Sequence, residues 1–249
     1  MDHNRPAETI MLPPRGWRIT PRHALIAALV CWSGFAAIVT LVLGDRLGSF
    51  DRAGLQYFRT GPDAVPWGSP ALLEAVRDWT ALGGVLLRNL FALIAIAALL
   101  LIRLRREATL LAATILSGWV VSTLIKSLVG RPRPTIVSHL AEAGGSSFPS
   151  GHSFNSAVVY MGIALALASL SARRGARWSM IAGAALVTAL IAVSRVWLGV
   201  HYPSDVIAGW LGGTAWALTA SALLYRPARQ FADAAAPAIE AATPGELTG

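Results

Sequence analysis

The chain has few charged residues, one lysine and one cysteine. Of its 249 residues, 14% are Asp, Glu, Lys or Arg and 55% are hydrophobic, whereas a soluble domain has about 25% charged residues. The single cysteine, Cys31, excludes an intrachain disulfide and a Cys-x-x-Cys metal or redox site, so we interpret it as a packing residue. The formal net charge of +8 is carried by short arginine groups between apolar runs. This pattern argues against a nucleic-acid partner and favours a membrane protein.

Six apolar segments are each about long enough to cross a bilayer, which takes about 20 residues. They cover residues 24–44, 83–102, 108–129, 154–171, 178–198 and 205–225. Backbone groups in lipid must be hydrogen bonded within the chain, so helices are the plausible spanning elements at these lengths. The first segment is too long for the apolar region of a cleavable signal, and we expect it to stay as the first helix. The sequence therefore predicts an all-α integral membrane bundle of six transmembrane helices.

Arginines outside the six segments predict the orientation of the bundle. They precede the first segment, separate the second from the third and the fourth from the fifth, and follow the sixth. The four groups are Arg5, Arg15, Arg18 and Arg22; Arg103, Arg105 and Arg106; Arg173, Arg174 and Arg177; Arg226 and Arg229. With six spans, all four groups lie on one side, which the positive-inside rule makes cytoplasmic. Both termini are then expected in the cytoplasm.

This topology divides the chain into three parts. We expect a cytoplasmic N-terminal segment at 1–23, a six-helix domain at 24–225 with an outer loop at 45–82, and a disordered cytoplasmic tail at 226–249 that is rich in Ala, Pro and Glu. Within the outer loop, apolar residues at helical spacing predict a helix near 72–82. Two placements stay open for it, on the membrane surface or packed against the spans.

Polar residues interrupt the apolar pattern in three clusters. The clusters are Lys126 with Arg131-Pro132-Arg133-Pro134, then Pro149-Ser150-Gly151-His152, and then Ser194-Arg195 with His201 and Asp205. They fall at the ends of the third and fifth segments and at the starts of the fourth and sixth, so alternation of the spans brings all three to the outer side. Cations there oppose the positive-inside bias, and binding of an anion explains them.

Each cluster offers a chemical role. Arg133 and Arg195 present planar forks that grip phosphate oxygens, and Lys126 adds a point charge. A helix start such as Gly151 attracts anions through its free N–H groups. The four-residue spacing of His201 and Asp205 lets the carboxylate fix one imidazole nitrogen and leave the other free to attack.

Structural alternatives accompany these roles. Asp205 is also suited to capping the first turn of its helix, and Pro149-Ser150-Gly151 to an ordinary turn with a helix cap. The arginines 131 and 133 are also typical of interfacial residues that extend their head groups to water. For Arg88 we expect the side chain to point outward, with contact to a second phosphate or a head group as the alternative.

With these residues, the chain resembles the type 2 phosphatidic acid phosphatase superfamily, in particular its membrane lipid phosphatase branch. The first family motif is Lys, six residues and Arg-Pro, the second is Pro-Ser-Gly-His, and the third is Ser-Arg, five residues, His, three residues and Asp. The matching residues are Lys126, Arg133 and Pro134; 149–152; and Ser194, Arg195, His201 and Asp205. The motifs cover residues 126–205, and the span pattern extends the resemblance over about 24–225.

The resemblance implies a function and residue roles. His201 would be the nucleophile that forms a phosphohistidine, Asp205 would orient it, and His152 would protonate the leaving oxygen. The phosphate would be bound by Lys126, Arg133, Ser150, Gly151 and Arg195. No metal or other cofactor is expected. The substrate would be a lipid phosphate or diphosphate from the bilayer, of the undecaprenyl diphosphate, phosphatidylglycerol phosphate or phosphatidate type, or a lipid A phosphate. The protein would lie in the bacterial inner membrane with its site facing the periplasm.

Other functions stay open on the sequence alone. Transfer of the phosphate to an acceptor other than water uses the same residues, and a non-catalytic protein that binds or translocates lipid head groups needs only the cations. Vanadium haloperoxidases resemble the same motifs, but six apolar spans argue against them. The oligomeric state and the role of the 45–82 loop cannot be read from the sequence.

Overall fold

The computed structural model of the protein describes residues 21–171 and 173–241. The predicted segment at 1–23 therefore lies almost entirely outside the described residues. The elements are α1 (Pro21–Leu43), α2 (Gly48–Tyr57), β1 (Arg59–Thr60), β2 (Val65–Pro66), α3 (Pro70–Ala81), α4 (Val85–Leu101), α5 (Arg105–Val129), α6 (Gly151–Leu170), α7 (Arg174–Trp197) and α8 (Pro203–Ala241). The two strands pair antiparallel, with Arg59 opposite Pro66. Apart from this short ladder, the described fold is helical, as predicted.

Five helices are long and apolar enough to cross a membrane: α1, α5, α6, α7 and the part of α8 up to Leu223. The second predicted span corresponds to α4, which has 17 residues. It forms a pair with α3, bent by 45° at the Gly83-Gly84 junction, and this pair brings the number of candidate spans in the described chain to six. The predicted segments thus coincide with α1, α4, α5, α6, α7 and α8, to within a few residues at most ends.

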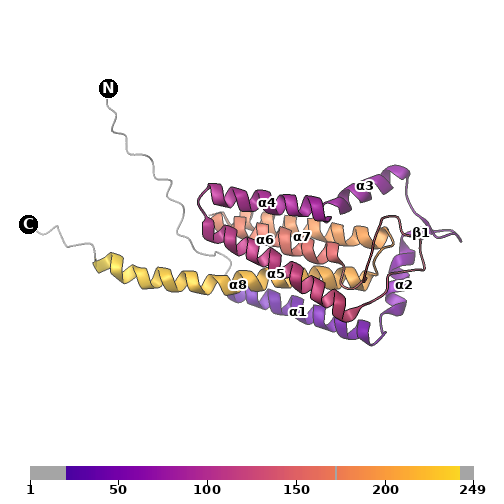
Figure 1. The fold of residues 1–249 in the computed structure, drawn as a ribbon, viewed down its shortest axis with the longest axis horizontal. Coiled ribbons are helices and arrows are strands. Elements are labelled where there is room, and N and C mark those ends of the chain that lie inside the picture. The colour runs from indigo at the N-terminus through magenta and orange to yellow at the C-terminus, as the bar shows by residue number, and fades with distance from the viewer. Residues whose placement is uncertain (1–20, 172, 242–249) are drawn as a thin grey trace, which may run out of the picture.

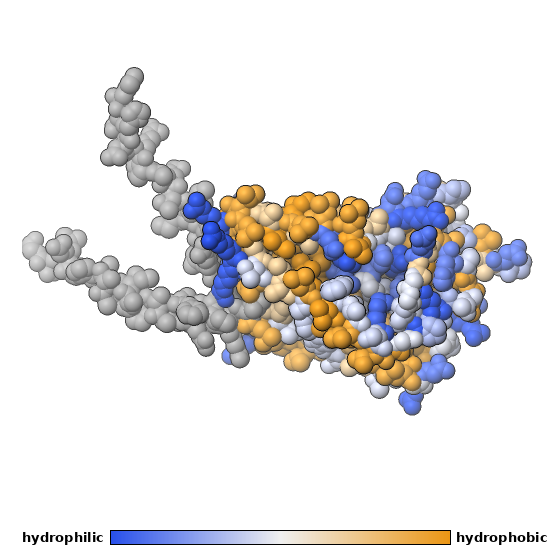
Figure 2. Space-filling view, viewed as in Figure 1, coloured by the Kyte–Doolittle hydropathy of each residue, from blue (hydrophilic) through white to orange (hydrophobic). Residues whose placement is uncertain are grey.

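Helices α6 and α8 form the centre of the bundle (Figure 1). They pack against each other, α1 also packs on α8, and α7 packs on α6. Of the apolar parts of α6 and α8, 56% and 61% of the residues are buried, against 11% for α1. Outer helices instead expose large apolar side chains, such as Leu86 and Leu128. Figure 2 shows hydrophobic side chains over the middle of the bundle and hydrophilic ones at its two ends, as expected for a surface that faces lipid.

The predicted outer loop is an ordered layer at one end of the bundle, where α2, β1 and α3 lie (Figure 1). The predicted helix near 72–82 is α3, whose N-cap Ser69 accepts a hydrogen bond from the Leu72 N–H. Its apolar residues, Leu72 among them, pack against the buried cluster of Trp197, Leu198 and Val200. Of the two placements left open, the structure therefore shows packing against the end of α7.

Helix α8 continues beyond the bundle to Ala241 (Figure 1). It thereby enters the segment 226–249 that we predicted to be a disordered tail, and the part of that segment described here is helical. Alanine has the highest helix propensity and is abundant between residues 232 and 242. The rest of the predicted tail, 242–249, lies outside the described residues.

Candidate active site

The end of α5 places the first cluster. Lys126 lies in the last turn of α5, and its Nζ donates to the Ser146 carbonyl at 2.6 Å. Gly130 ends the helix in the left-handed conformation, with φ 59°, which a residue without Cβ adopts at little cost. The chain then turns into the segment that carries Arg131 and Arg133, so all three cations of this cluster start from one helix end.

The start of α6 holds the second cluster beside the first. Ser150 is the N-cap, and its Oγ accepts from the Ser153 N–H at 3.4 Å. Its own N–H donates to the Asp205 carbonyl at 3.0 Å, which ties this turn to α8. A Cβ added to Gly151 would lie 3.5 Å from Lys126 Cε, so the lysine stem passes directly over the helix start. Ser150 thus serves as the helix cap considered from the sequence, and a role in phosphate binding stays a prediction.

The turn between α7 and α8 holds the third cluster. His201 is 2% exposed, and its Nδ1 lies 3.5 Å from Asp205 Oδ2. Asp205 also accepts from the Tyr202 backbone N–H at 2.9 Å, which caps the first turn of α8. One carboxylate therefore caps the helix and contacts the imidazole, and the catalytic role of Asp205 stays a prediction.

The contacts of His201 define its tautomer. Arg133 Nη1 lies 3.2 Å from His201 Nε2. A guanidinium can only donate, so Nε2 is the acceptor and the ring proton belongs on Nδ1. That proton faces the Asp205 carboxylate and the Ser147 hydroxyl, whose Oγ lies 3.4 Å from Nδ1. The Nε2 lone pair therefore points toward a cation, where an anionic substrate would be held.

Burial sets the protonation state of this imidazole. It lowers the pKa of His201 to about 4, and the hydrogen bond and charge of Asp205 only partly oppose it. A neutral ring at neutral pH is the form that has a free lone pair.

Arg133 is held rigidly by backbone oxygens. Its Nε and Nη2 donate to the carbonyls of Gly145 and Gly144, at 3.1 and 2.7 Å, and its Nη1 donates to the Val200 carbonyl at 2.7 Å. Burial lowers the pKa of Arg133, and Asp205 partly opposes this shift. Together with the contact to His201 Nε2, these bonds use four of the five guanidinium N–H groups. The fixed guanidinium keeps its charge and one Nη2 N–H to receive a phosphate oxygen.

Arg195 approaches the same place from the last turn of α7. It is 3% exposed, and its Nη1 donates to Thr80 Oγ1 of α3 at 3.2 Å. Within the described part of the chain, its Nε has no hydrogen-bond partner. A buried donor without a partner is costly, so this nitrogen is available for a ligand. The remaining motif residue, His152, lies within electrostatic range of Arg195 and His201.

Several residues that contact the motif residues were not predicted from the sequence. Ser147 donates to Asp205 Oδ2 and also contacts His201. Asp51 of α2 accepts from Arg131, and Thr80 of α3 accepts from Arg195. None of these small polar residues stands out in a sequence, because their role depends on which segments the fold brings together.

The structure does not place Arg131 as the interfacial residue that we kept as an alternative for it. Its Nη1 donates to Asp205 Oδ1 at 2.7 Å and its guanidinium lies 4.2 Å from the centre of the Tyr202 ring. Burial lowers its pKa, but Asp205 and Asp51 outweigh this effect and the pKa of Arg131 is raised overall. The first arginine of this cluster therefore orients the carboxylate, and the second faces the imidazole.

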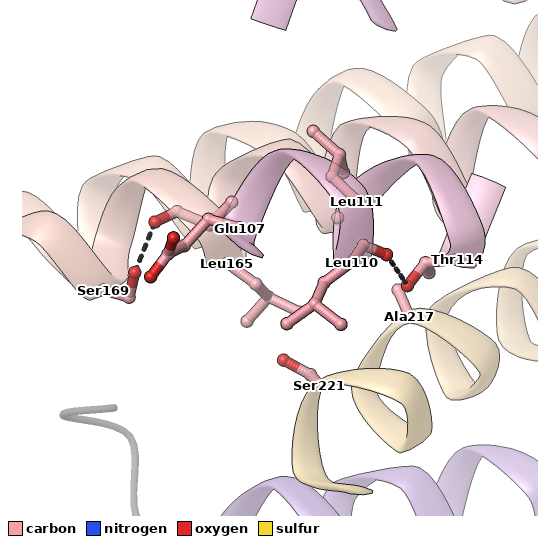
Figure 3. A pocket seen from close by; sticks show the side chains of 10 residues that line it. Glu107, Leu110, Leu111, Thr114, Leu165, Ser169, Ala217 and Ser221 are labelled. Atoms are coloured by element: carbon pink, nitrogen blue, oxygen red, sulfur yellow. Dashed lines mark hydrogen bonds between the residues drawn. The ribbon is translucent and has the colours of Figure 1, made fainter. Parts of the chain in front are cut away.

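A hollow between α5, α6 and α8 lies at the other end of these helices (Figure 3). Glu107, Leu110, Leu165 and Ser221 are among the residues that line it. Glu107 is in the first turn of α5, whereas Lys126 is in the last turn. The hollow contains none of the motif residues, so it is separate from the site described above.

The chain belongs to the PAP2 superfamily. The profile of this superfamily matches residues 106–229, which contain all three clusters. Phosphatidylglycerophosphatase B of Bacillus subtilis is 37% identical over 94 residues, which are 36% of this chain and 44% of that protein. Decaprenylphosphoryl-5-phosphoribose phosphatase of Mycobacterium tuberculosis is 34% identical over 132 residues, 51% of this chain and 67% of that protein. The chain thus aligns with about half to two thirds of the length of these curated relatives.

A solved structure has the same fold. The crystal structure of a transmembrane PAP2 type phosphatidylglycerolphosphate phosphatase from Bacillus subtilis aligns with 86% of this chain and 96% of its own, with a TM-score of 0.61 and 24% sequence identity. The alignment extends well beyond the motif region, so the arrangement of most helices is shared with a protein of the membrane.

Proposed function

We propose that this protein removes phosphate from a membrane lipid phosphate or diphosphate through a phosphohistidine intermediate on His201, without a metal. The geometry of His201 is the observation that carries the proposal. Its Nδ1 faces Asp205 at 3.5 Å and its Nε2 faces the Arg133 guanidinium at 3.2 Å. The nucleophilic nitrogen is thereby directed to the point where a phosphate would bind a fixed arginine.

The first chemical step forms the intermediate. The Nε2 lone pair attacks phosphorus, the bond from phosphorus to the leaving oxygen breaks, and that oxygen takes the bonding electron pair. His152 supplies a proton to the leaving oxygen. The Nδ1 proton stays with the imidazole, whose developing positive charge is stabilised by Asp205.

The second step releases phosphate. A water molecule attacks the phosphorus of the phosphohistidine and the phosphorus–nitrogen bond breaks, which returns the lone pair to Nε2. His152, neutral after the first step, accepts the proton of this water. The two steps balance without an oxidant, a reductant or a metal-bound nucleophile.

Three cations stabilise the transferred group in both steps. The charges of Arg133 and Arg195 act on His201, and Lys126 lies within electrostatic range of Arg133 and Asp205. Phosphoryl transfer depends on neutralising the charge on the equatorial oxygens. In the described residues, no group of three His, Cys, Asp or Glu side chains lies close enough to hold a metal ion. We assign charge neutralisation to the three cationic side chains.

The position of the site supports action on the outer leaflet. The clusters lie at the end of the bundle where α2 and α3 form a polar layer, and the arginines 103, 105, 106, 173 and 174 belong to the opposite end. The positive-inside rule places that arginine-rich end in the cytoplasm. The two relatives named above act on a phosphatidylglycerol phosphate and on a polyprenyl-linked phosphate, so lipid phosphates are the class to test first.

The test is phosphate release in detergent with EDTA, from a panel that includes undecaprenyl diphosphate, phosphatidylglycerol phosphate and phosphatidate. We expect release by the wild type and none by His201→Ala. Undiminished release by His201→Ala would contradict the mechanism. No release by the wild type, unless an alcohol acceptor is added, would identify a phosphotransferase instead. Binding of the lipids without turnover in either case would identify a head-group binding protein.

A further inference from the structure

Arg88 is a buried cation that the mechanism above does not use. It lies one turn into α4 and is 6% exposed, so the outward orientation expected from the sequence is wrong. Across the described ranges, its one side-chain hydrogen bond runs from Nη1 to the Gly83 carbonyl at 3.3 Å, and no carboxylate pairs with it. A guanidinium has five N–H donors, and a buried cation at membrane depth requires compensation. Arg88 therefore keeps donors for an anion.

Gly83 connects Arg88 to His152. A Cβ added to Gly83 would lie 3.2 Å from His152 Cδ2 and 3.0 Å from Ser156 Oγ. The Gly83 backbone thus packs directly against both side chains, while its carbonyl accepts from Arg88. The charge of Arg88 also acts on the His152 ring. Gly83 therefore contacts both the Arg88 guanidinium and the His152 imidazole.

Ser156 supplies a second polar group without a partner. It follows His152 by one turn of α6, is fully buried, and its Oγ has no hydrogen-bond partner among the residues described. Arg195, whose charge also acts on His152, likewise has a buried Nε without a partner in the described chain. Ser156 Oγ and Arg195 Nε are thus two buried groups near the proposed acid that lack partners, in addition to the spare donors of Arg88. Unpaired buried polar groups mark a place for a ligand.

We propose that Arg88 and Ser156 bind a second phosphate of the substrate, joined to the transferred phosphate through the bridging oxygen. The inference rests on the proposed function, in which His152 protonates the leaving oxygen. In a lipid diphosphate, the leaving group is a lipid monophosphate, and its charged oxygens lie next to the oxygen that His152 protonates. In a simple phosphate ester, the leaving oxygen is attached to carbon, and Arg88 would face an apolar group. The preferred substrate is therefore a lipid diphosphate.

The chemical step keeps its balance with this substrate. The bond between the transferred phosphorus and the bridging oxygen breaks, and the electron pair stays on that oxygen. His152 donates its proton there, and the product is the lipid monophosphate. Arg88 stabilises the negative charge that grows on this leaving phosphate. Arg88 therefore binds the leaving group and not the transferred phosphate.

The test compares Arg88→Ala with the wild type on a polyprenyl diphosphate and on the monophosphate with the same tail, using full-length protein in detergent. Charge-assisted hydrogen bonds to phosphate predict a loss of roughly 30-fold in kcat/KM for the diphosphate and a loss of about 3-fold or less for the monophosphate. Arg52→Ala, which removes an exposed arginine of α2, is the matched control and should change neither rate. Melting temperature in detergent verifies that each variant is folded.

Equal losses on both substrates, or no loss on the diphosphate, would overturn the proposal while leaving the phosphatase function standing. A second measurement does not need turnover. In the His201→Ala background, inorganic pyrophosphate should raise the melting temperature more than orthophosphate, and Arg88→Ala should abolish the difference. If pyrophosphate and orthophosphate stabilise His201→Ala equally while Arg88 is intact, the second phosphate site is overturned. This outcome is independent of whether the proposed hydrolysis is observed.

Discussion

Arg131 donates from Nη2 to Asp51 Oδ2 at 2.7 Å, and its other terminal nitrogen, Nη1, donates to Asp205 Oδ1 at 2.7 Å. Asp51 is 1% exposed, belongs to α2 and lies outside the three motifs. It also accepts from the Ser204 N–H at 2.9 Å at the start of α8. The outer layer is therefore bonded to the residues that orient the Asp205 carboxylate, and we predict that Asp51 acts as a positioning residue.

Replacing Asp51 by Asn tests this connection. Loss of the charge should let Arg131 and the start of α8 move, which weakens the fixed contact between Asp205 and His201. We expect kcat to fall about 10-fold with a smaller change in KM, and stability to fall by on the order of 1–3 kcal/mol. Phosphate release and thermal unfolding in detergent measure the two effects. Asp63→Asn, in an exposed loop, is the control; a lower melting temperature with unchanged kcat would assign Asp51 a structural role alone.

Asp205→Asn should have a larger effect than loss of Ser147. An amide in place of the carboxylate can donate to Nδ1, which would move the ring proton to Nε2 and remove the nucleophilic lone pair. A wrong tautomer of this kind is expected to lower kcat by roughly 10³-fold or more. Ser147→Ala leaves the carboxylate in place and should lower kcat by only about 10-fold. Rapid quenching with labelled substrate measures phosphoenzyme formation. Similar rates for the two variants would contradict the proposed tautomer.

The helical fold was largely predictable because lipid imposes a simple rule. Backbone groups must be satisfied within each span, so the apolar runs coincide with helices, and the arginine pattern required an even number of spans. The bend between α3 and α4 was not predicted. The break between the two helices contains Gly83 and Gly84, and the composition on either side of it does not determine an angle.

The site was predictable to the extent that its residues lie in short motifs. Alternation of spans placed Lys126, His152 and His201 at one end, and the contacts of α5, α6 and α8 bring their ends together. Asp51 and Thr80 could not be found in this way, because each comes from the outer loop and makes its contact across about 80 or more residues of sequence. Packing of α2 and α3 on the bundle decides those contacts.

His152→Ala should reveal which oxygen this residue protonates. If His152 is the acid, the loss in kcat depends on how much the leaving group needs a proton. We expect a loss of about 10²–10⁴-fold with an alkyl phosphate and a much smaller one with p-nitrophenyl phosphate. Steady-state rates across a series of leaving groups measure this. An equal loss across the series would show that His152 binds the phosphate and is not the acid.

The pH dependence of catalysis follows from the burial of His201. An unperturbed histidine would lose activity below about pH 6.5. Burial lowers the pKa of His201 to about 4, so its Nε2 stays neutral and able to attack well below that pH. We expect the acid limb of kcat/KM that belongs to the nucleophile near pH 4, measured by phosphate release in detergent. An acid limb of kcat/KM near pH 6.5, whose position changes in an Asp205 variant, would contradict the lowered pKa of His201.

The lowered pKa of His201 can also be detected through protein stability, without substrate. The folded state protonates His201 near pH 4, and the unfolded state does so near its usual pKa of about 6.5. Between these values the unfolded chain binds more protons, so the contribution of His201 to stability is complete above about pH 6.5 and is lost as the pH falls toward 4. His201→Asn removes this dependence. The melting temperature of the wild type, relative to that of His201→Asn, should therefore fall across this range, and a constant difference between the two proteins would show that His201 is not buried as a neutral ring.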